Sequence, residues 1–382
     1  MNLHITTLPG LEPVLAEELR ELGVEGVEQG RQTVSCQGNE EWIYRLNLSL
    51  RTGLRVLWEI RQAPIRSVQD LYRAARAIPW EQYIHPHQTI AVSVSSPGVQ
   101  WVSPRYLPLV VKDAVVDRFS ELYGRRPSVD THSPHLPIHL HLEGSLGIFS
   151  LDTSGESLHR RGYRTEKTEA PLSEVLAAGI LKLIRWRRDV PLYDPMCGSG
   201  TFLVEAGLMA YMIPPGILRS HFAFQNWKVF DRTLYERVEK ELKATPRNEP
   251  GIRLFGSDKD PEALEITRRN LIRAGLGGKV HLFQGTFETA PPPFPPEQGG
   301  VIIMNPPYGK RLQDPSILDL YKRIGDTLKQ RYPGVDAWIF SANPDALKQI
   351  GLRTFKKCTL KNGPLDCRLV GFHLYASAAG TL

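Results

Sequence analysis

The sequence has few cysteines, and they are not arranged as metal-binding or redox pairs. The four are Cys36, Cys197, Cys358 and Cys367, with no Cys-x-x-Cys spacing and no group of histidines beside them. Zinc sites and disulfide frameworks depend on such pairs. We therefore expect reduced thiols, no bound metal and a cytoplasmic location.

Long apolar runs are also missing. The nearest candidate, residues 175–184, is interrupted by Lys182, and a span of a bilayer needs roughly 20 apolar residues. The start of the chain lacks a basic region followed by an apolar core, so we expect no signal peptide and no membrane partner. The chain has 47 Lys and Arg against 41 Asp and Glu, a net charge of +6 and a pI near 9.1. This balance is compatible with a nucleic-acid partner but does not require one.

The chain is long enough for several domains. Its 382 residues exceed one typical core, so we expect two or three domains. Residues 1–62 alternate strand-like and helix-like segments in the order β-α-β-β-α-β, which is typical of a ferredoxin-like unit. A second α+β unit follows at 63–155, with expected strands at 89–95, 137–142 and 146–152 and expected helices at 68–77 and 107–123.

Two further patterns favour structural roles over binding roles. His139 and His141 alternate with apolar residues along one expected strand, which places the histidines on its solvent face. We expect no metal site at this pair, because a solvated strand face accounts for the histidines better than metal binding does. In the long connection at 207–250, an aromatic cluster is expected to form a packed subcore: Phe222, Phe224, Trp227 and Phe230.

The segment Asp194-Pro195-Met196-Cys197-Gly198-Ser199-Gly200-Thr201 indicates a cofactor site. A short apolar strand precedes it and a helix pattern follows it, so the glycines lie in a tight turn at the carboxyl end of a strand. Asp194 would repel a pyrophosphate but suits a cofactor with an amine and a ribose, such as S-adenosylmethionine. We expect the backbone of Met196 and Cys197 to contact the amino acid end of that cofactor.

A second acid stands at the end of the next expected strand. Asp258 follows the strand at 252–255 and is placed to accept both ribose hydroxyls of a nucleoside, with Lys259 beside it. Asp260 is better placed to cap the helix that begins at Glu262. Two acids at successive strand ends are a stronger signal than either acid alone.

The sequence Asn305-Pro306-Pro307-Tyr308 follows the apolar strand 301–304 and is the most specific motif in the chain. An exocyclic amine on an aromatic ring is a poor nucleophile because its lone pair is delocalised. The Asn305 side-chain oxygen and the Pro306 carbonyl can accept the two hydrogens of such an amine. Pro306 and Pro307 fix the loop, and Tyr308 offers a face on which a flipped base can stack. We assign no general base.

Further strand-like segments are expected to complete the sheet of the C-terminal α/β domain. Strands are expected at 279–283 and 336–341, and paired strands at 353–360 and 367–375 enclose an Asn362-Gly363 turn longer than two residues. The segment 156–173 interleaves basic residues with an aromatic, which suits RNA phosphates and a stacked base. A solvated linker is the equally weighted alternative. The expected RNA-binding residues are Arg160, Arg161, Tyr163, Arg164, Lys310 and Arg311.

The segments "TTLPGLEPVLAEEL", "WIYRLNLSLRTGLRVLWEI" and "NGPLDCRL", with the motifs above, resemble the THUMP-containing guanine-N2 RNA methyltransferases. This resemblance implies a Rossmann-like class I methyltransferase domain at 173–382, preceded by a ferredoxin-like domain at 1–62, a THUMP domain at 63–155 and a linker at 156–172. It also implies that the cofactor is S-adenosyl-L-methionine and that the substrate is RNA. Family members usually carry Asp at the position of Thr286, so Thr286 and Phe287 are expected to hold the adenine in a different way.

We expect an enzyme that forms N2-methylguanosine, with large-subunit ribosomal RNA as first choice and transfer RNA as second. Adenine N6 in a nucleic acid and a glutamine amide in a protein are also compatible with Asn-Pro-Pro-Tyr. A non-catalytic RNA-binding assembly factor is a further alternative, which the presence of Asp194, Asp258 and Asn305 disfavours. A monomer is the expected state, although no residue determines it.

Overall fold

The computed structural model describes residues 1–164, 172–244, 251, 253–295, 298–308 and 314–375. The chain divides into two compact units. The first comprises residues 1–7, 15–158 and 219–244, and the second comprises residues 8–14, 159–218 and 245–382.

The first unit contains a mixed sheet of order β2-β3-β1-β4-β8-β7-β5-β6. Its strands are β1 Asn2–Thr6, β2 Glu25–Gln29, β3 Thr33–Gln37, β4 Arg55–Pro64, β5 Thr89–Ser95, β6 Ser128–Val129, β7 Leu136–Glu143 and β8 Leu146–Asp152. Its helices are α2 Glu40–Ser49, α3 Val68–Arg76, α4 Leu107–Tyr123 and α7 Arg232–Ala244, with short 3-10 turns at η1 Trp80–Gln82 and η3 Ala223–Asn226. Helix α1, Glu12–Glu21, begins in the second unit and continues in the first.

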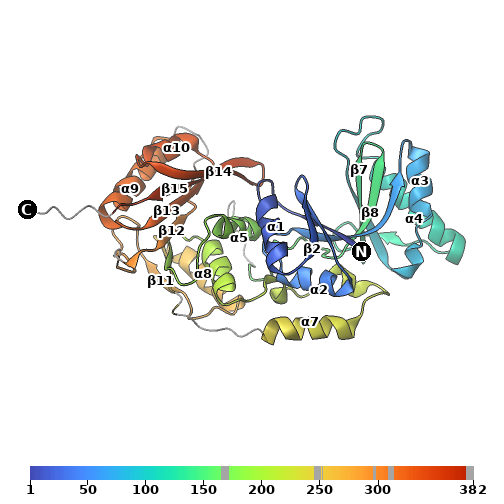
Figure 1. Ribbon diagram of the computed structural model, residues 1–382, viewed down its shortest axis with the longest axis horizontal. Coiled ribbons are helices and arrows are strands. Elements are labelled where there is room, and N and C mark those ends of the chain that lie inside the picture. The colour runs from blue at the N-terminus through green and yellow to red at the C-terminus, as the bar shows by residue number, and fades with distance from the viewer. Residues whose placement is uncertain (165–171, 245–250, 252, 296–297, 309–313, 376–382) are drawn as a thin grey trace, which may run out of the picture. The chain divides into compact units, whose positions relative to one another are not determined.

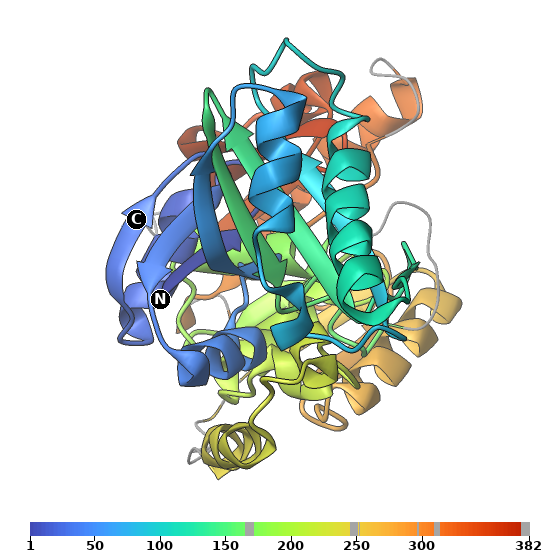
Figure 2. The ribbon, with the colours of Figure 1, turned by 90° about the vertical axis from the view of Figure 1, so that its right-hand side faces the viewer.

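The expected α+β pattern is confirmed, but its two parts share one sheet. β4 pairs antiparallel with β1 on one side and with β8 on the other. The expected boundary near residue 62 therefore lies inside a long strand. The register of β4 against β8 shifts between Glu59 and Arg61, and the pairing continues on both sides of that shift. Helices α3 and α4 lie side by side, to the right of the strands β7 and β8 in Figure 1 and in front of them in Figure 2.

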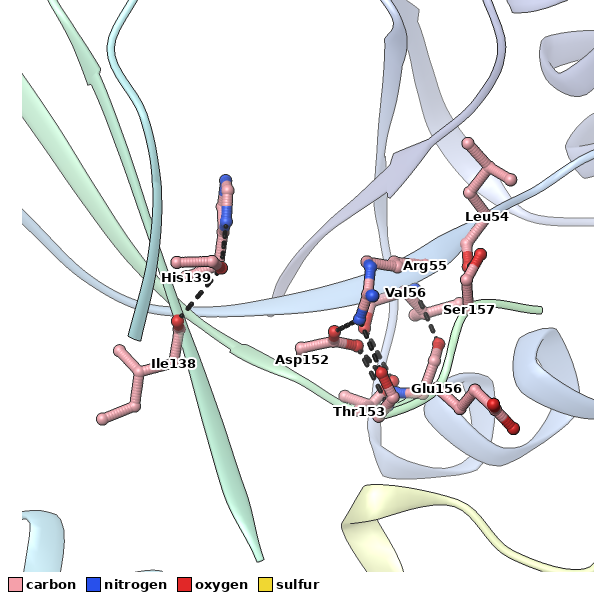
Figure 3. Close-up of polar contacts among 12 residues, drawn as sticks. Leu54, Arg55, Val56, Ile138, His139, Asp152, Thr153, Glu156 and Ser157 are labelled. Carbon is pink, nitrogen blue, oxygen red and sulfur yellow. Dashed lines mark hydrogen bonds and ion pairs between the residues drawn. The ribbon is translucent and has the colours of Figure 1, made fainter. Parts of the chain in front are cut away.

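A polar cluster fixes the end of β8 against β4 (Figure 3). The Arg55 guanidinium contacts the Asp152 carboxylate and donates to the Gly155 carbonyl at 2.6 Å. Asp152 also accepts the backbone N–H groups of Ser154 and Gly155, at 3.0 and 3.2 Å. Burial raises the pKa of Asp152, and Arg55 opposes that shift. A buried carboxylate with these partners stabilises the turn that leaves the sheet.

The histidines of β7 are less exposed than the alternation predicts. His139 and His141 are half-buried, and both contact the Ser95 hydroxyl of β5, at 3.1 and 2.8 Å. Burial lowers the pKa of His139 to about 4. Among the described residues, no group of three or more His, Cys, Asp or Glu side chains is arranged to hold a metal ion.

The aromatic subcore expected in the 207–250 connection is confirmed, and it belongs to the first unit. Phe222 and Phe224 are stacked with ring centroids 5.3 Å apart, and Phe224 lies 4.9 Å from the ring of Tyr44 on α2. Trp227 is buried and donates its indole N–H to the His135 carbonyl at 2.9 Å. A segment from within the methyltransferase-like pattern thus completes the core of the N-terminal unit.

The second unit contains a seven-stranded sheet of order β11-β10-β9-β12-β13-β15-β14. Its strands are β9 Leu192–Asp194, β10 Leu254–Asp258, β11 His281–Gln284, β12 Val301–Met304, β13 Asp336–Ser341, β14 Thr354–Asn362 and β15 Leu365–His373. Its helices are α5 Glu174–Leu183, α6 Thr201–Ala210, α8 Pro261–Arg273, α9 Pro315–Arg331 and α10 Pro344–Gln349, with a 3-10 turn at η2 Pro215–Leu218.

Along this order, the strands from β11 to β13 run parallel, and β15 is antiparallel to both of its neighbours, β13 and β14. The strand order reverses between β9 and β12, which is where open α/β sheets bind ligands. The hairpin turn differs from expectation. Asn362 pairs with Leu365, so the turn is the two residues Gly363 and Pro364, and Gly363 has a φ of 59°. No helix in the described part of the chain is both long and apolar enough to span a membrane.

Candidate active site

A cavity of about 260 Å³ lies at the carboxyl ends of β9 and β12. Strands β9 and β12 are neighbours and run parallel, so the side chains that follow them meet at one edge of the sheet. The lining residues are Leu172, Asp194, Met196, Cys197, Gly198, Ser199, Thr201, Phe202, Asp260, Glu262, Ala263, Ile266 and Asn305. The structure thus brings the predicted cofactor turn and the predicted amine-binding asparagine together.

Helix α8 holds the turn that follows Asp194. Thr267 donates its hydroxyl to the Gly198 carbonyl at 2.7 Å, and Asn270 donates its amide to the Ser199 carbonyl at 2.9 Å. Gly200 has a φ of 76°, and a Cβ there would lie 2.6 Å from Thr267 Cγ2. Both bracing residues are buried and have no role in the sequence-based site. Their sequence signal is their spacing on an expected helix, together with the resemblance of the segment from Asp258 to Asn270 to the family pattern.

Asp194 is a buried carboxyl group at the wall of the cavity. It is 2% exposed, and its Oδ1 accepts the Met196 N–H at 3.2 Å. Burial raises the pKa of Asp194 well above its ordinary value, and the negative charge of Asp258 adds to the shift. A carboxylate in this environment is stabilised by a cation. The cavity therefore fits a ligand that carries an amine, as S-adenosylmethionine does.

Asp258 is placed at the same turn, and its carboxylate contacts the backbone. Its two oxygens accept the N–H groups of Gly198 and Asp260, at 2.9 and 3.0 Å. Each oxygen has a second lone pair for a hydroxyl. Asp260 lines the cavity and accepts the Glu262 N–H at 2.9 Å, so its expected role as the cap of α8 is confirmed. Lys259 is exposed.

The Asn305–Tyr308 loop is folded back on itself. The Tyr308 hydroxyl donates to Asn305 Oδ1, and the Asn343 amide donates to the Tyr308 carbonyl at 3.1 Å. Pro306 is buried, Pro307 is exposed and Tyr308 is half-buried. Burial raises the pKa of the Tyr308 hydroxyl, so it remains a hydrogen-bond donor at neutral pH. Asn343 has no role in the sequence-based site.

The predicted adenine contacts are not brought to the cavity. The Phe287 ring is buried in the core and stacks on Tyr332, with centroids 5.3 Å apart and planes at 16°. The sheet has an apolar core on this side, and an aromatic ring packs into it. The expected contact between the Phe287 ring and the adenine is therefore wrong. Thr286 is exposed, and its hydroxyl lies 2.8 Å from that of Thr289.

Three of the expected RNA-binding residues belong instead to an internal ionic cluster. Arg161 and Tyr163 are each 1% exposed, and both face the buried carboxylate of Glu205 on α6, at 3.5 and 3.4 Å. Buried side chains do not meet RNA phosphates, so the expected RNA contacts of this pair are wrong. Arg164 donates to Thr201 Oγ1 at 2.5 Å and pairs with Glu174 at 3.3 Å.

The other members of that set have different placements. Arg160 is exposed. Lys310 and Arg311 lie outside the described residues. The sequence offered no sign that Glu174 and Glu205 are buried, because each lies in a helix whose surroundings only the fold defines.

Three family models match successive parts of the chain. Residues 2–57 match an RlmL ferredoxin-like domain, residues 66–152 match a THUMP domain, and residues 161–371 match an RMKL-like methyltransferase domain.

Full-length relatives and solved structures agree with these matches. A Synechocystis sp. protein described as "Putative RNA methyltransferase" is 41% identical over 97% of this chain and 96% of its own length. The ribosomal RNA large subunit methyltransferase K/L of Allochromatium vinosum is 39% identical over 95% of this chain but only 50% of its own length. The crystal structure of SMU.472, described as "a putative methyltransferase complexed with SAH", superposes with a TM-score of 0.86 at 31% identity, covering 98% of both chains.

Proposed function

Because the chain belongs to the RMKL-like methyltransferase family, we propose that it transfers a methyl group from S-adenosylmethionine to N2 of a guanine in 23S ribosomal RNA. One observation carries the proposal: Asn305, from an Asn-Pro-Pro-Tyr loop, lines the same cavity as Asp194. Asn305 as an acceptor for an amine and Asp194 as a carboxylate for a cationic cofactor would both serve a ligand in this one cavity, which supports the proposal.

The cofactor side of the proposal depends on charge. When bound, S-adenosylmethionine supplies a methyl group on a positively charged sulfur. The buried Asp194 carboxylate is assigned to the cofactor amine, since that cation offsets the burial that raises the pKa of Asp194. The backbone of Met196 to Gly200 is assigned to the same end of the cofactor, and Asp258 to its ribose. Thr286, which is exposed, is the residue proposed to contact the adenine.

The substrate side depends on the reacting loop. The Asn305 side-chain oxygen and the Pro306 carbonyl accept the two hydrogens of the target amine, so that its lone pair points along the ring normal. The N–C bond forms as the sulfur–methyl bond breaks, and the cationic amine then loses a proton to these acceptors or to water. Tyr308 supplies a stacking face for a base swung out of its helix.

The choice of substrate is supported by the relatives and by the THUMP match. The Allochromatium protein is named for ribosomal RNA, although the present chain spans only half of that protein. The THUMP match at 66–152 supports RNA over DNA or protein. We propose RNA as the partner of a monomeric cytoplasmic enzyme, with Arg160, Lys310 and Arg311 as further proposed RNA contacts. Transfer RNA is the second candidate.

The test is methyl transfer to RNA from cells that lack the protein. Total RNA is incubated with the protein and S-adenosylmethionine carrying a labelled methyl group, and the labelled nucleoside is then identified by mass spectrometry. We expect N2-methylguanosine in the 23S fraction and no label with the Asn305→Ala variant. Label only in N6-methyladenosine, in transfer RNA or in protein would overturn the proposed substrate.

A further inference from the structure

Asn343 is a buried residue at the end of β13 that holds two parts of the second unit together. Its side-chain oxygen accepts the N–H groups of Asp345 and Ala346, at 3.1 and 2.9 Å, and so caps α10. Its amide group donates to the Tyr308 carbonyl at 3.1 Å. The residue is fully buried, and one short side chain therefore joins a helix start to the reacting loop.

Asn343 is also held by a series of buried hydrogen bonds through Ser341 and Tyr321. The Asn343 N–H donates to the Ser341 hydroxyl at 3.1 Å, and that hydroxyl lies 2.7 Å from the hydroxyl of Tyr321 on α9. Ser341 and Tyr321 are also buried. Polar groups held in this way by a strand, a helix and a cap have little freedom to move.

The other end of the connection is Tyr308, which makes two hydrogen bonds. Tyr308 has its carbonyl held by Asn343, while its hydroxyl donates to Asn305 Oδ1. An amide oxygen has two lone pairs, so an amine that binds Asn305 Oδ1 shares this acceptor with the Tyr308 hydroxyl. The backbone bond from Asn343 lets the Tyr308 side chain adjust to the bound amine without moving the Asn305 and Pro306 acceptors.

We propose that Asn343 is a positioning residue for methyl transfer: its amide fixes the Tyr308 backbone, so that Asn305 and Pro306 stay aimed at the target amine while the Tyr308 side chain adjusts to the bound base. This inference rests on the proposed function, since it assumes that an amine binds at Asn305. Asn343 acts through Tyr308. A catalytic site built on a loop depends on such supporting contacts for its geometry.

Two substitutions separate this role from helix capping. Asn343→Asp keeps an acceptor for the α10 cap but replaces the donor to Tyr308 with a second acceptor. Asn343→Ser keeps a shorter capping hydroxyl, carries no buried charge and does not reach Tyr308. The matched control is Asn39→Asp, which makes the same change at the cap of α2, where Asn39 accepts the Trp42 N–H at 3.1 Å.

Each variant is measured in four ways. These are the melting temperature, the affinity for S-adenosylmethionine by calorimetry, kcat on total RNA from cells lacking the protein, and hydrogen exchange of the peptide 301–308. We expect both Asn343 variants to lower kcat about ten-fold, the effect of losing one oriented hydrogen bond. Cofactor affinity should change by less than about two-fold. Exchange in 301–308 should become faster, and Asn39→Asp should change none of the four.

Unchanged kcat in both Asn343 variants, or a matching loss of cofactor affinity, would overturn the proposal. So would unchanged exchange of the peptide 301–308. If the unaltered protein transfers no methyl group to RNA, the proposed function fails instead, and the exchange comparison still decides whether Asn343 holds the loop.

Discussion

The Tyr308 hydroxyl donates a hydrogen bond to the side-chain oxygen of Asn305, the same oxygen that is proposed to accept a hydrogen from the target amine. The loop is therefore internally satisfied before a base arrives. A target amine adds a second donor at this oxygen, which has two lone pairs. The net contribution of the new contact is then small, about 1 kcal/mol, as for a typical intramolecular hydrogen bond.

Removal of the competing hydroxyl should leave the stacking face and free the acceptor. We expect Tyr308→Phe to keep kcat and to lower KM for RNA by up to about five-fold, the equivalent of one neutral hydrogen bond. Tyr308→Ala should raise KM by about ten-fold or more, because base–aromatic stacking contributes about 1–3 kcal/mol. Steady-state kinetics on RNA from cells lacking the protein measures both. A Phe variant as impaired as the Ala variant would show that the hydroxyl itself takes part in the reaction.

A second prediction concerns the pH dependence of stability. Burial raises the pKa of Asp194 in the folded protein, so protonation stabilises the cofactor-free fold. This contribution is present below the unfolded pKa of about 3.9 and is lost as the pH rises through the raised folded pKa. Asp194→Asn should therefore melt at a higher temperature than the unaltered protein at pH 8, and the difference should shrink as the pH falls.

The same substitution should damage function. The amide that replaces the Asp194 carboxylate carries no charge to pair with the cofactor amine, so we expect affinity for S-adenosylmethionine to fall by about ten-fold or more. Calorimetry measures the affinity, and scanning calorimetry from pH 5 to pH 8 measures the melting temperature. Equal melting temperatures across this range, with equal affinity, would remove Asp194 from the cofactor site.

Features marked by local sequence were predictable. Asp194, Asp258 and Asn305 each lie at the end of a short apolar strand or directly after one, and parallel strands bring their carboxyl ends to one edge. The helix cap Asp260 and the strand β12 follow from the same local signals. The acids and the asparagine at the strand ends were therefore predictable. Other lining residues were not, since no role was expected for Phe202, Glu262, Ala263 and Ile266.

Features that depend on distant contacts were not predictable. Arg161 and Tyr163 form a basic and aromatic pattern, as an RNA-binding surface would. Only the fold shows that both side chains are buried against the Glu205 carboxylate. Phe287 has the same local setting as an adenine-binding residue but faces Tyr332. The same sequence pattern can therefore pack in the core or form a binding site, and the residues around it in the fold determine which.

The aromatic subcore of the 219–244 segment should stabilise the N-terminal unit without serving the cofactor. Phe224 contacts Tyr44, Phe222 and Phe230, and it is 2% exposed. We expect Phe224→Ala to lower the free energy of unfolding of this unit by about 3–5 kcal/mol. Affinity for S-adenosylmethionine should change less than about two-fold. Urea unfolding followed by circular dichroism, with calorimetry of the cofactor, checks both parts, and a large loss of affinity would contradict the separation.

Two glycines of the cofactor turn offer a matched pair for the last prediction. Gly198 and Gly200 have φ values of 54° and 76°, so alanine at either position costs about 1 kcal/mol in backbone strain. A Cβ at Gly198 has no atom within 4 Å, whereas a Cβ at Gly200 would lie 2.6 Å from Thr267 Cγ2. Gly200→Ala must also push α8 away from the turn, and Thr267 is the residue that holds the Gly198 carbonyl.

We therefore expect Gly200→Ala to destabilise the second unit more than Gly198→Ala and to weaken cofactor binding by about ten-fold more. Shortening the opposing side chain should relieve part of the clash, so the double variant Gly200→Ala, Thr267→Ser should recover some of the lost melting temperature. Differential scanning calorimetry and cofactor titration of the two single variants and the double variant measure these effects. Equal melting temperatures and equal cofactor affinities of the two single variants would contradict this. They would mean that α8 moves aside without loss of stability, and that backbone conformation alone holds the turn.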